Sequence, residues 1–210
     1  MMDLRSLETT HLIQKGLKLM NSGITPNPFI RQIIDMQSYS LGPEVTPMGI
    51  SFYIAPLINA VVRVGALEER ELVFKCFLDK YAHNIVPSTK QGEQGQTEKL
   101  TVQGSRLTTN IRNRQRRQQN NAAEELTGHI DSDYLEDNSI IVVKTGGSIV
   151  KDLNGLVANQ VKSKYERPVL VLNEDNGKLS GSGRGFESPV MDDFREFIRN
   201  SGFAEYAEGQ

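Results

Sequence analysis

Apolar residues recur at helical spacing through the first part of the chain. The earliest set lies on one helix face and comprises Leu4, Leu7, Leu12, Ile13, Leu17 and Met20. Asn21-Ser22-Gly23 should end that helix, because glycine after the last apolar position is typical of a helix end. Asn27-Pro28 then predicts a capped start for a second helix, whose apolar stripe covers residues 29–34.

Two more helical patterns follow before residue 82. Thr46-Pro47 opens one whose apolar positions continue to Val62, and Pro56 should kink or interrupt it because proline lacks a backbone N–H. Residues 67–81 carry the other, with acidic residues in the first turn, where the helix dipole favours negative charge. Residues 1–82 are therefore predicted to form an all-helical block.

The pattern changes after this block. Residues 83–104 are polar and punctuated by proline and glycine, which predicts a linker or loop. Residues 105–128 predict a long connecting helix with almost no apolar face. Its first half carries the arginines Arg106, Arg112, Arg114, Arg116 and Arg117. Positive charge early in a helix opposes the dipole, and two interpretations stay open: a solvated bridging helix, or a basic stripe that faces a phosphate backbone.

The remaining residues, 129–210, alternate between strand and helix patterns. A β-branched run at 139–143 predicts a buried strand, residues 149–165 a helix, and residues 167–172 a second strand. Asp175-Asn176-Gly177 predicts a hairpin turn into residues 178–183, and a last helical pattern opens at Ser188-Pro189. The predicted fold class is α/β: an N-terminal helical block, a long connecting helix and a small C-terminal α/β domain with a mixed sheet.

Composition narrows the possible chemistry. A net charge of -2 over 210 residues predicts no overall attraction to nucleic acid, so any polyanion site must be local. Cys76 is the only cysteine, which excludes an internal disulfide and a thiolate zinc cluster and fits a reducing cytoplasm. No apolar run is long enough to predict a membrane span, and the chain is expected to be cytoplasmic, with no membrane partner.

Familiar site motifs are missing from the sequence. The three histidines, His11, His83 and His129, are far apart and show no ligand spacing. Neither a Walker lysine nor the Rossmann glycine spacing occurs, and the acidic cluster at 131–137 is typical of a solvated loop. These observations favour neither a metal site nor a nucleotide cradle.

One segment does suggest anion binding. Gly181-Ser182-Gly183-Arg184 combines two glycines, a hydroxyl and a guanidinium, which together can surround a cluster of anionic oxygens. A Gly/Ser turn that ends in arginine is also common in turns with no ligand. The sequence therefore makes Ser182, Gly183 and Arg184 candidate phosphate ligands.

Several segments resemble the RecJ single-stranded-DNA exonucleases of the DHH phosphoesterase superfamily. Residues 54–65 are similar to that family's Pro-x-Ile-Asn-Ala-x-x-Arg-x-Gly segment, and residues 2–17 to the stretch after its last metal-binding aspartate motif. Residues 113–117 resemble the start of its interdomain helix. Residues 147–159, 167–169 and 181–184 resemble its DHH-associated domain, in which a Ser-Gly-Arg element faces the catalytic cleft.

The sequence also departs from the family. No Asp-His-His signature occurs, and the chain stops at Gly209-Gln210, where the family continues its Gly-Gly-His or Gly-Gln-His motif. By the resemblance the metal ligand lies upstream of Asp3, so Asp3 receives no metal. The chain is expected to be the middle and rear part of a RecJ-like enzyme, without catalytic residues and inactive by itself.

The resemblance implies 5′-to-3′ hydrolysis of single-stranded DNA by the complete enzyme, in repair, recombination or replication. It implies Mn²⁺, or alternatively Mg²⁺, bound by residues absent from this chain. Single-stranded DNA is the implied partner, with a single-stranded-DNA-binding protein or a helicase as further candidates. This chain would supply substrate-binding residues: Asn59, Arg63, Arg116, Arg117, Ser182, Gly183 and Arg184.

Other interpretations stay open. Asn59 and Arg63 are one helical turn apart, and they could simply cap the segment that ends at Gly65. The substrate could be a short oligonucleotide or a cyclic dinucleotide, as in smaller phosphodiesterases of the superfamily. The protein could also be a non-catalytic repair or replication scaffold.

Overall fold

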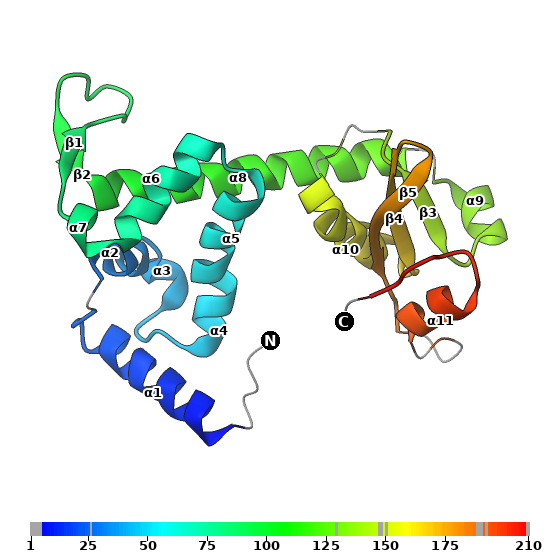
Figure 1. Ribbon diagram of the computed structural model, residues 1–210, viewed down its shortest axis with the longest axis horizontal. Helices are drawn as coiled ribbons and strands as arrows, with labels where there is room; N and C mark the ends of the chain where they lie inside the picture. Colours follow the sequence, from blue (N-terminus) through cyan, green and yellow to red (C-terminus); the bar gives the residue numbers. More distant parts are fainter. Residues whose placement is uncertain are drawn as a thin grey trace. The chain divides into compact units, whose positions relative to one another are not determined.

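The computed structural model describes residues 6–25, 27–128, 130–146, 149, 151–187, 191 and 193–208. The chain divides into two compact units, Met1–Gln115 and Arg116–Gln210, and the long helix α8 (Leu100–Thr127) belongs to both (Figure 1). The predicted fold class is confirmed: helices precede α8, and a small mixed sheet follows it.

Unit 1 is built from helices and one short hairpin. Its elements before α8 are α1 (Leu7–Asn21), α2 (Pro28–Met36), α3 (Ser38–Leu41), α4 (Pro47–Gly49), the π-helix η1 (Ile50–Ile54), α5 (Ala55–Val64), α6 (Leu67–Phe77), α7 (Asp79–Ala82), β1 (Ile85–Pro87) and β2 (Thr97–Lys99). The predicted cap at Asn27 is present, since its Oδ1 accepts hydrogen bonds from the N–H groups of Phe29 and Ile30 at 3.0 and 3.1 Å.

Pro56 does not end its helix, and it does not make a simple kink in it. The helix widens into the π-helix η1 immediately before α5, and Pro56 lies in the first turn of α5. A proline removes one backbone donor, and a local π segment is a known way to accommodate such a gap. The interruption predicted at Pro56 is therefore real, and it lies one turn ahead of the proline.

The core of unit 1 joins α2, α5, α6 and α8. Phe29, Leu57, Val61 and Cys76 are among its fully or almost fully buried members, and Phe29 packs edge-on against Phe77 at 4.9 Å between ring centroids. A Cβ added at Gly104 of α8 would lie 2.5 Å from the Cys76 Sγ. Only glycine allows α8 to approach α6 this closely.

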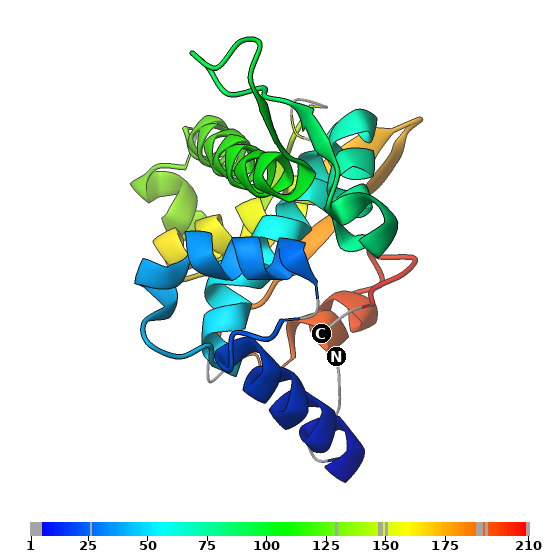
Figure 2. The same ribbon diagram turned by 90° about the vertical axis from the view of Figure 1, so that its left-hand side faces the viewer.

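Residues 83–104, predicted as a linker or loop, contain two short strands and the first residues of α8. Strands β1 and β2 pair antiparallel as a hairpin that extends from the helices of unit 1 (Figure 2), and α8 begins at Leu100, before the predicted start near 105. Strands of three residues carry too little apolar pattern to be recognised. The hairpin is held by side chains distant in sequence, which are described below.

Two surfaces of unit 1 are more apolar than expected. The described part of α1 has no buried residue, although its apolar residues share one helix face. Residues Pro47–Val64 also form a helix long and apolar enough to span a membrane, with a mean hydropathy of 1.4, contrary to the sequence expectation. Only 22% of this segment is buried, and Leu57, Ala60 and Val61 are its side chains that pack into the core.

Unit 2 contains α9 (Ser132–Asp137), β3 (Ile141–Lys144), the 3-10 helix η2 (Lys151–Leu153), α10 (Asn154–Tyr165), β4 (Val169–Asp175), β5 (Lys178–Arg184) and α11 (Phe194–Asn200). The sheet order is β3-β4-β5, parallel between the first pair and antiparallel between the second. Asn176 and Gly177 have φ of 53° and 77°, which confirms the predicted hairpin turn; Asp175 already pairs with Lys178, so the turn itself has two residues. The predicted opening of the last helix, Ser188-Pro189, lies outside the described residues.

One face of the sheet is covered by α10. Ile141, Val169 and Val171 are completely buried on this face, as are Val157 and Ala158 of the helix. The next strand, β5, carries serine and arginine where β3 and β4 carry valine and isoleucine. The apolar face therefore ends in a polar edge, and the predicted phosphate ligands lie there.

Candidate nucleic-acid interface

Ser182 and Arg184 project from the same face of β5. In the antiparallel register Arg184 is opposite Val169 and Ser182 is opposite Val171. Residues directly opposite in a sheet share a face, and both valines are buried beneath α10. The hydroxyl and the guanidinium therefore lie next to each other on the side of the sheet that α10 covers.

Gly155 of α10 provides the space for this pair. A Cβ added there would lie 2.6 Å from Arg184 Nη2 and 3.6 Å from Ser182 Oγ. Arg184 Nη1 donates to the carbonyl of Gly183 at 2.6 Å, and the described residues offer the guanidinium no carboxylate. Sequence reasoning missed Gly155, although a glycine within a helical pattern often marks close approach of another group.

Gly183 lies differently from its two neighbours. A Cβ at this position would contact Leu170 Cδ2 at 3.1 Å and Phe194 Cε1 at 3.2 Å. Leu170 is also the residue that pairs with Gly183 in the sheet. Gly183 thus faces the side of the sheet opposite to Ser182 and Arg184, where it admits the α11 aromatic ring.

Asn59 and Arg63 lie one turn apart on α5. Asn59 is exposed and Arg63 is half-buried, while Ala60 and Val61 turn into the core. Among the described residues neither side chain has a hydrogen-bond or ion-pair partner. The pair therefore presents an amide and a guanidinium on the surface of unit 1.

The corner after α5 is held by other side chains. Arg114 Nη2 donates to the carbonyl of Val64 at 3.0 Å and to Glu69 Oε2 at 2.6 Å, and the same Glu69 oxygen accepts from the Ala66 N–H at 2.8 Å. The hydrogen bond from Arg114 lowers the pKa of Glu69. The capping role considered for Asn59 and Arg63 thus belongs to Arg114 and Glu69.

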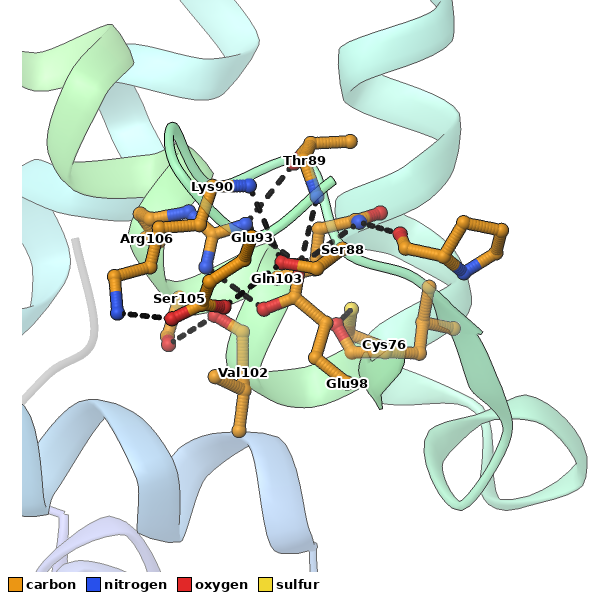
Figure 3. A network of polar contacts seen from close by, with 12 residues as sticks. Cys76, Ser88, Thr89, Lys90, Glu93, Glu98, Val102, Gln103, Ser105 and Arg106 are labelled. Atoms are coloured by element: carbon orange, nitrogen blue, oxygen red, sulfur yellow. Dashed lines mark hydrogen bonds and ion pairs between the residues drawn. The ribbon is translucent and has the colours of Figure 1, made fainter. Parts of the chain in front are cut away.

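Arg106 is also committed to a structural network. Its two terminal nitrogens each donate to a different oxygen of Glu98 at 2.7 Å, and Nη2 donates to the Thr89 hydroxyl at 3.0 Å (Figure 3). Gln103 Nε2 completes the network with the Pro87 carbonyl and Glu98. The hydrogen bond from Arg106 holds the pKa of Glu98 near 2. This network fastens the β1–β2 hairpin to α8.

The remaining arginines of α8 differ in their side-chain contacts. Arg112 Nη1 donates to Gln115 Oε1 at 2.7 Å. Arg116 and Arg117 are exposed, and no acidic partner occurs for them in the described ranges. The inner side of α8 is lined by small polar residues, since Ser105 and Thr108 are almost fully buried. The helix is therefore neither fully solvated nor uniformly basic.

A metal site requires several ligating side chains close together. Over the described ranges, no three side chains of the His, Cys, Asp or Glu type lie together in a way that could hold an ion. Asp3 and Gly209-Gln210, which the resemblance places beside metal motifs, lie outside those ranges. The described part of this chain does not fit the divalent metal that the resemblance implies.

Sequence comparison gives two similar curated proteins. One comes from Bacillus subtilis (strain 168) and the other from Bacillus phage SPbeta, and the names of both describe a single-strand DNA-specific exonuclease, YorK. Each is 32% identical to this chain over 99% of its length. The chain spans 36% of the length of these relatives. No family model matches the sequence.

Comparison with solved structures finds that the fold is similar to that of RecJ. RecJ from Thermus thermophilus with Mg²⁺ aligns with a TM-score of 0.60 at 18% identity, over 91% of this chain and 25% of RecJ. The same protein with Mn²⁺ aligns with a TM-score of 0.54 at 18% identity, over 78% of this chain and 21% of RecJ. The resemblance read from the motifs is thereby confirmed: the chain is similar in sequence to proteins named as single-strand DNA-specific exonucleases and similar in fold to RecJ, and it spans about a third of the length of its curated relatives.

Proposed function

We propose that this chain is the substrate-binding part of a RecJ-like exonuclease that hydrolyses phosphodiester bonds of single-stranded DNA. The names of the two curated relatives support the substrate, and the fold shared with RecJ supports the reaction class. Metal-assisted hydrolysis requires a divalent ion, which would activate water and stabilise the charge on the phosphate. That ion would be held outside the described part of this chain.

One observation carries the proposal. Arg184 and Ser182 lie side by side over Gly155, and the described residues give Arg184 no carboxylate to neutralise it. A guanidinium without an acidic partner, next to a serine hydroxyl, is suited to phosphate oxygens. We assign this pair to a terminal or scissile phosphate.

The other candidate residues would contact the rest of the strand. Arg63 is a cation with no acidic partner in the described ranges, so it is available to a backbone phosphate, and Asn59 one turn away could bond a sugar or base. Arg116 and Arg117 would add non-specific backbone contacts. Gly183 would act through packing, because it faces Phe194.

The test measures binding of the 210-residue chain to a single-stranded oligonucleotide, with and without a terminal phosphate at either end. Arg184→Ala should weaken binding about 10- to 100-fold, since a charged hydrogen bond contributes about 1.5–3 kcal/mol. Arg199→Ala is the matched control, because Arg199 pairs with Glu208 at 3.0 Å in the same unit. Equal affinities for both variants would disprove the assignment.

A second measurement addresses the substrate class. Affinity for oligonucleotides of increasing length should rise with length if the chain tracks a DNA strand. A plateau at two or three nucleotides would instead indicate a phosphodiesterase of short oligonucleotides. A role in DNA repair, and a single-stranded-DNA-binding protein or helicase as partner, stay predictions.

A further inference from the structure

Three polar side chains are buried at one end of the apolar face of unit 2. Thr145 follows β3, Asn173 belongs to β4 and Asn154 is the first residue of α10, and they are 3%, 4% and 2% exposed. Val157 and Val171 nearby are completely buried. The other buried side chains that β3 and β4 contribute to this face are apolar, so the buried polar group requires an explanation.

The three side chains are connected through one acceptor. Asn173 Oδ1 accepts from Thr145 Oγ1 at 2.9 Å and from Asn154 Nδ2 at 2.8 Å. The second amide oxygen of the network, Asn154 Oδ1, is buried and receives no hydrogen bond from the described residues. A buried acceptor without a donor destabilises a fold, and an apolar side chain at position 154 would avoid that cost. Stability alone therefore does not account for Asn154.

The location of Asn154 suggests its role. It directly precedes Gly155, over which Arg184 Nη2 and Ser182 Oγ lie. Its bond to Asn173 ties the first turn of α10 to β4 in a fixed direction, which an apolar contact cannot do. The distance between Gly155 and the Arg184 guanidinium depends on that turn.

The sheet register relates the buried polar network to the pair of Ser182 and Arg184. Asn173, Val171 and Val169 alternate along one face of β4, and Val171 and Val169 are opposite Ser182 and Arg184. The buried network and the phosphate pair thus share one face of the sheet and one helical turn. A shift of that turn would move the surface on which Arg184 rests.

We infer that Asn154, through Asn173 and Thr145, is a positioning residue that sets the Arg184 guanidinium by fixing Gly155. The inference rests on the proposed function, in which Arg184 binds a nucleic-acid phosphate. Asn154 touches neither phosphate nor strand in this scheme. It acts only through the helix turn.

The test compares Asn154→Leu with Asn159→Leu, the same change at an exposed position of α10. In the full chain Asn154→Leu should weaken binding of a 5′-phosphorylated single-stranded oligonucleotide about fivefold, a fraction of the loss expected for Arg184→Ala. Its melting temperature should stay equal or rise, because the unpaired oxygen is removed and Asn173 keeps its bond from Thr145. Asn159→Leu should leave affinity unchanged.

Two further readouts separate positioning from a structural role. Nuclear magnetic relaxation of the Arg184 Nε–H group should show greater mobility in Asn154→Leu than in Asn159→Leu. In the Arg184→Ala background, Asn154→Leu should cause no additional loss of affinity, since both act through one guanidinium.

The outcomes distinguish this inference from the proposed function. If Arg184→Ala weakens binding but Asn154→Leu does not, or if the two losses add, the positioning role is wrong and the proposed function stands. A lower melting temperature in Asn154→Leu would also overturn the positioning role. If Arg184→Ala leaves affinity unchanged, the proposed function fails, and the mobility of Arg184 alone decides whether Asn154 positions it.

Discussion

The arginines of unit 1 on α8 and Arg184 of unit 2 differ in what surrounds their guanidinium groups. Arg106 and Arg114 each bond both oxygens of one glutamate, Glu98 and Glu69. Arg184 bonds only the carbonyl beside it within the described residues. A cluster of positive charge in sequence therefore does not identify a polyanion site, because a carboxylate distant in sequence can neutralise it.

This difference predicts opposite results for two arginine substitutions. Arg114→Met should destabilise unit 1 by about 2 kcal/mol, since the Val64 carbonyl loses its side-chain donor and Glu69 keeps only the hydrogen bond from the Ala66 N–H. Its effect on DNA affinity at a temperature where the chain stays folded should be small. Arg184→Ala should instead weaken DNA binding and change the stability of the fold little. Thermal unfolding and oligonucleotide binding on both variants check the pair, and the comparison breaks if either variant changes both quantities together.

The dependence of stability on pH tests the ion pair between Arg106 and Glu98. The hydrogen bonds from Arg106 hold the pKa of Glu98 near 2, below its ordinary value of 4.5. A lowered carboxyl pKa contributes stability above the ordinary value, and that contribution disappears as pH falls from about 4.5 to about 2. Glu98→Gln should cost about 1–2 kcal/mol at pH ~7 and less at pH ~3. Urea unfolding at several pH values measures this, and a loss independent of pH would contradict the role of the ion pair.

Local signals explain which parts of the fold were predictable. Asn27 caps α2 through its own side chain, and Asn176-Gly177 form the turn through their own backbone geometry; both lie where predicted. The β1–β2 hairpin depends instead on Glu98 reaching Arg106, eight residues along the chain. The inner side of α8 is lined by serine and threonine, which a hydrophobic pattern does not register.

The candidate site shows the same limit. Ser182 and Arg184 were identifiable from their motif. The predicted strand ended at residue 183, whereas β5 includes Arg184, and only then does the alternation of a strand place both side chains on one face. Gly155 was hidden because its importance comes from a side chain on another element. Asn154 was hidden for the same reason, since its partner Asn173 belongs to the next strand. Such residues become recognisable only once the elements are packed.

Gly155→Ala tests whether DNA binding requires the close approach of Arg184 to α10. The added Cβ would lie 2.6 Å from Arg184 Nη2, so the guanidinium must move. Affinity for a phosphorylated oligonucleotide should fall about tenfold, while helix propensity favours alanine by about 1 kcal/mol and limits any loss of stability. Gly16→Ala on α1, where a Cβ meets nothing within 4 Å, is the control. Unchanged binding in Gly155→Ala would show that the guanidinium is not held in place there.

The smallest expected effect concerns Arg116 and Arg117, which are exposed and resemble Arg184 in lacking an acidic partner among the described residues. If they contact a DNA backbone, each contributes released counterions, and the slope of log affinity against log salt should fall by about 0.7 for each arginine removed. Affinity at moderate salt should change only a few-fold, uniformly across sequences. Arg199→Ala, whose guanidinium is paired with Glu208, should leave the slope unchanged. Equal slopes for Arg116→Ala, Arg117→Ala and this control would mean that both arginines are only solvated charges on a bridging helix. Exposure without an acidic partner would then not be sufficient for DNA binding.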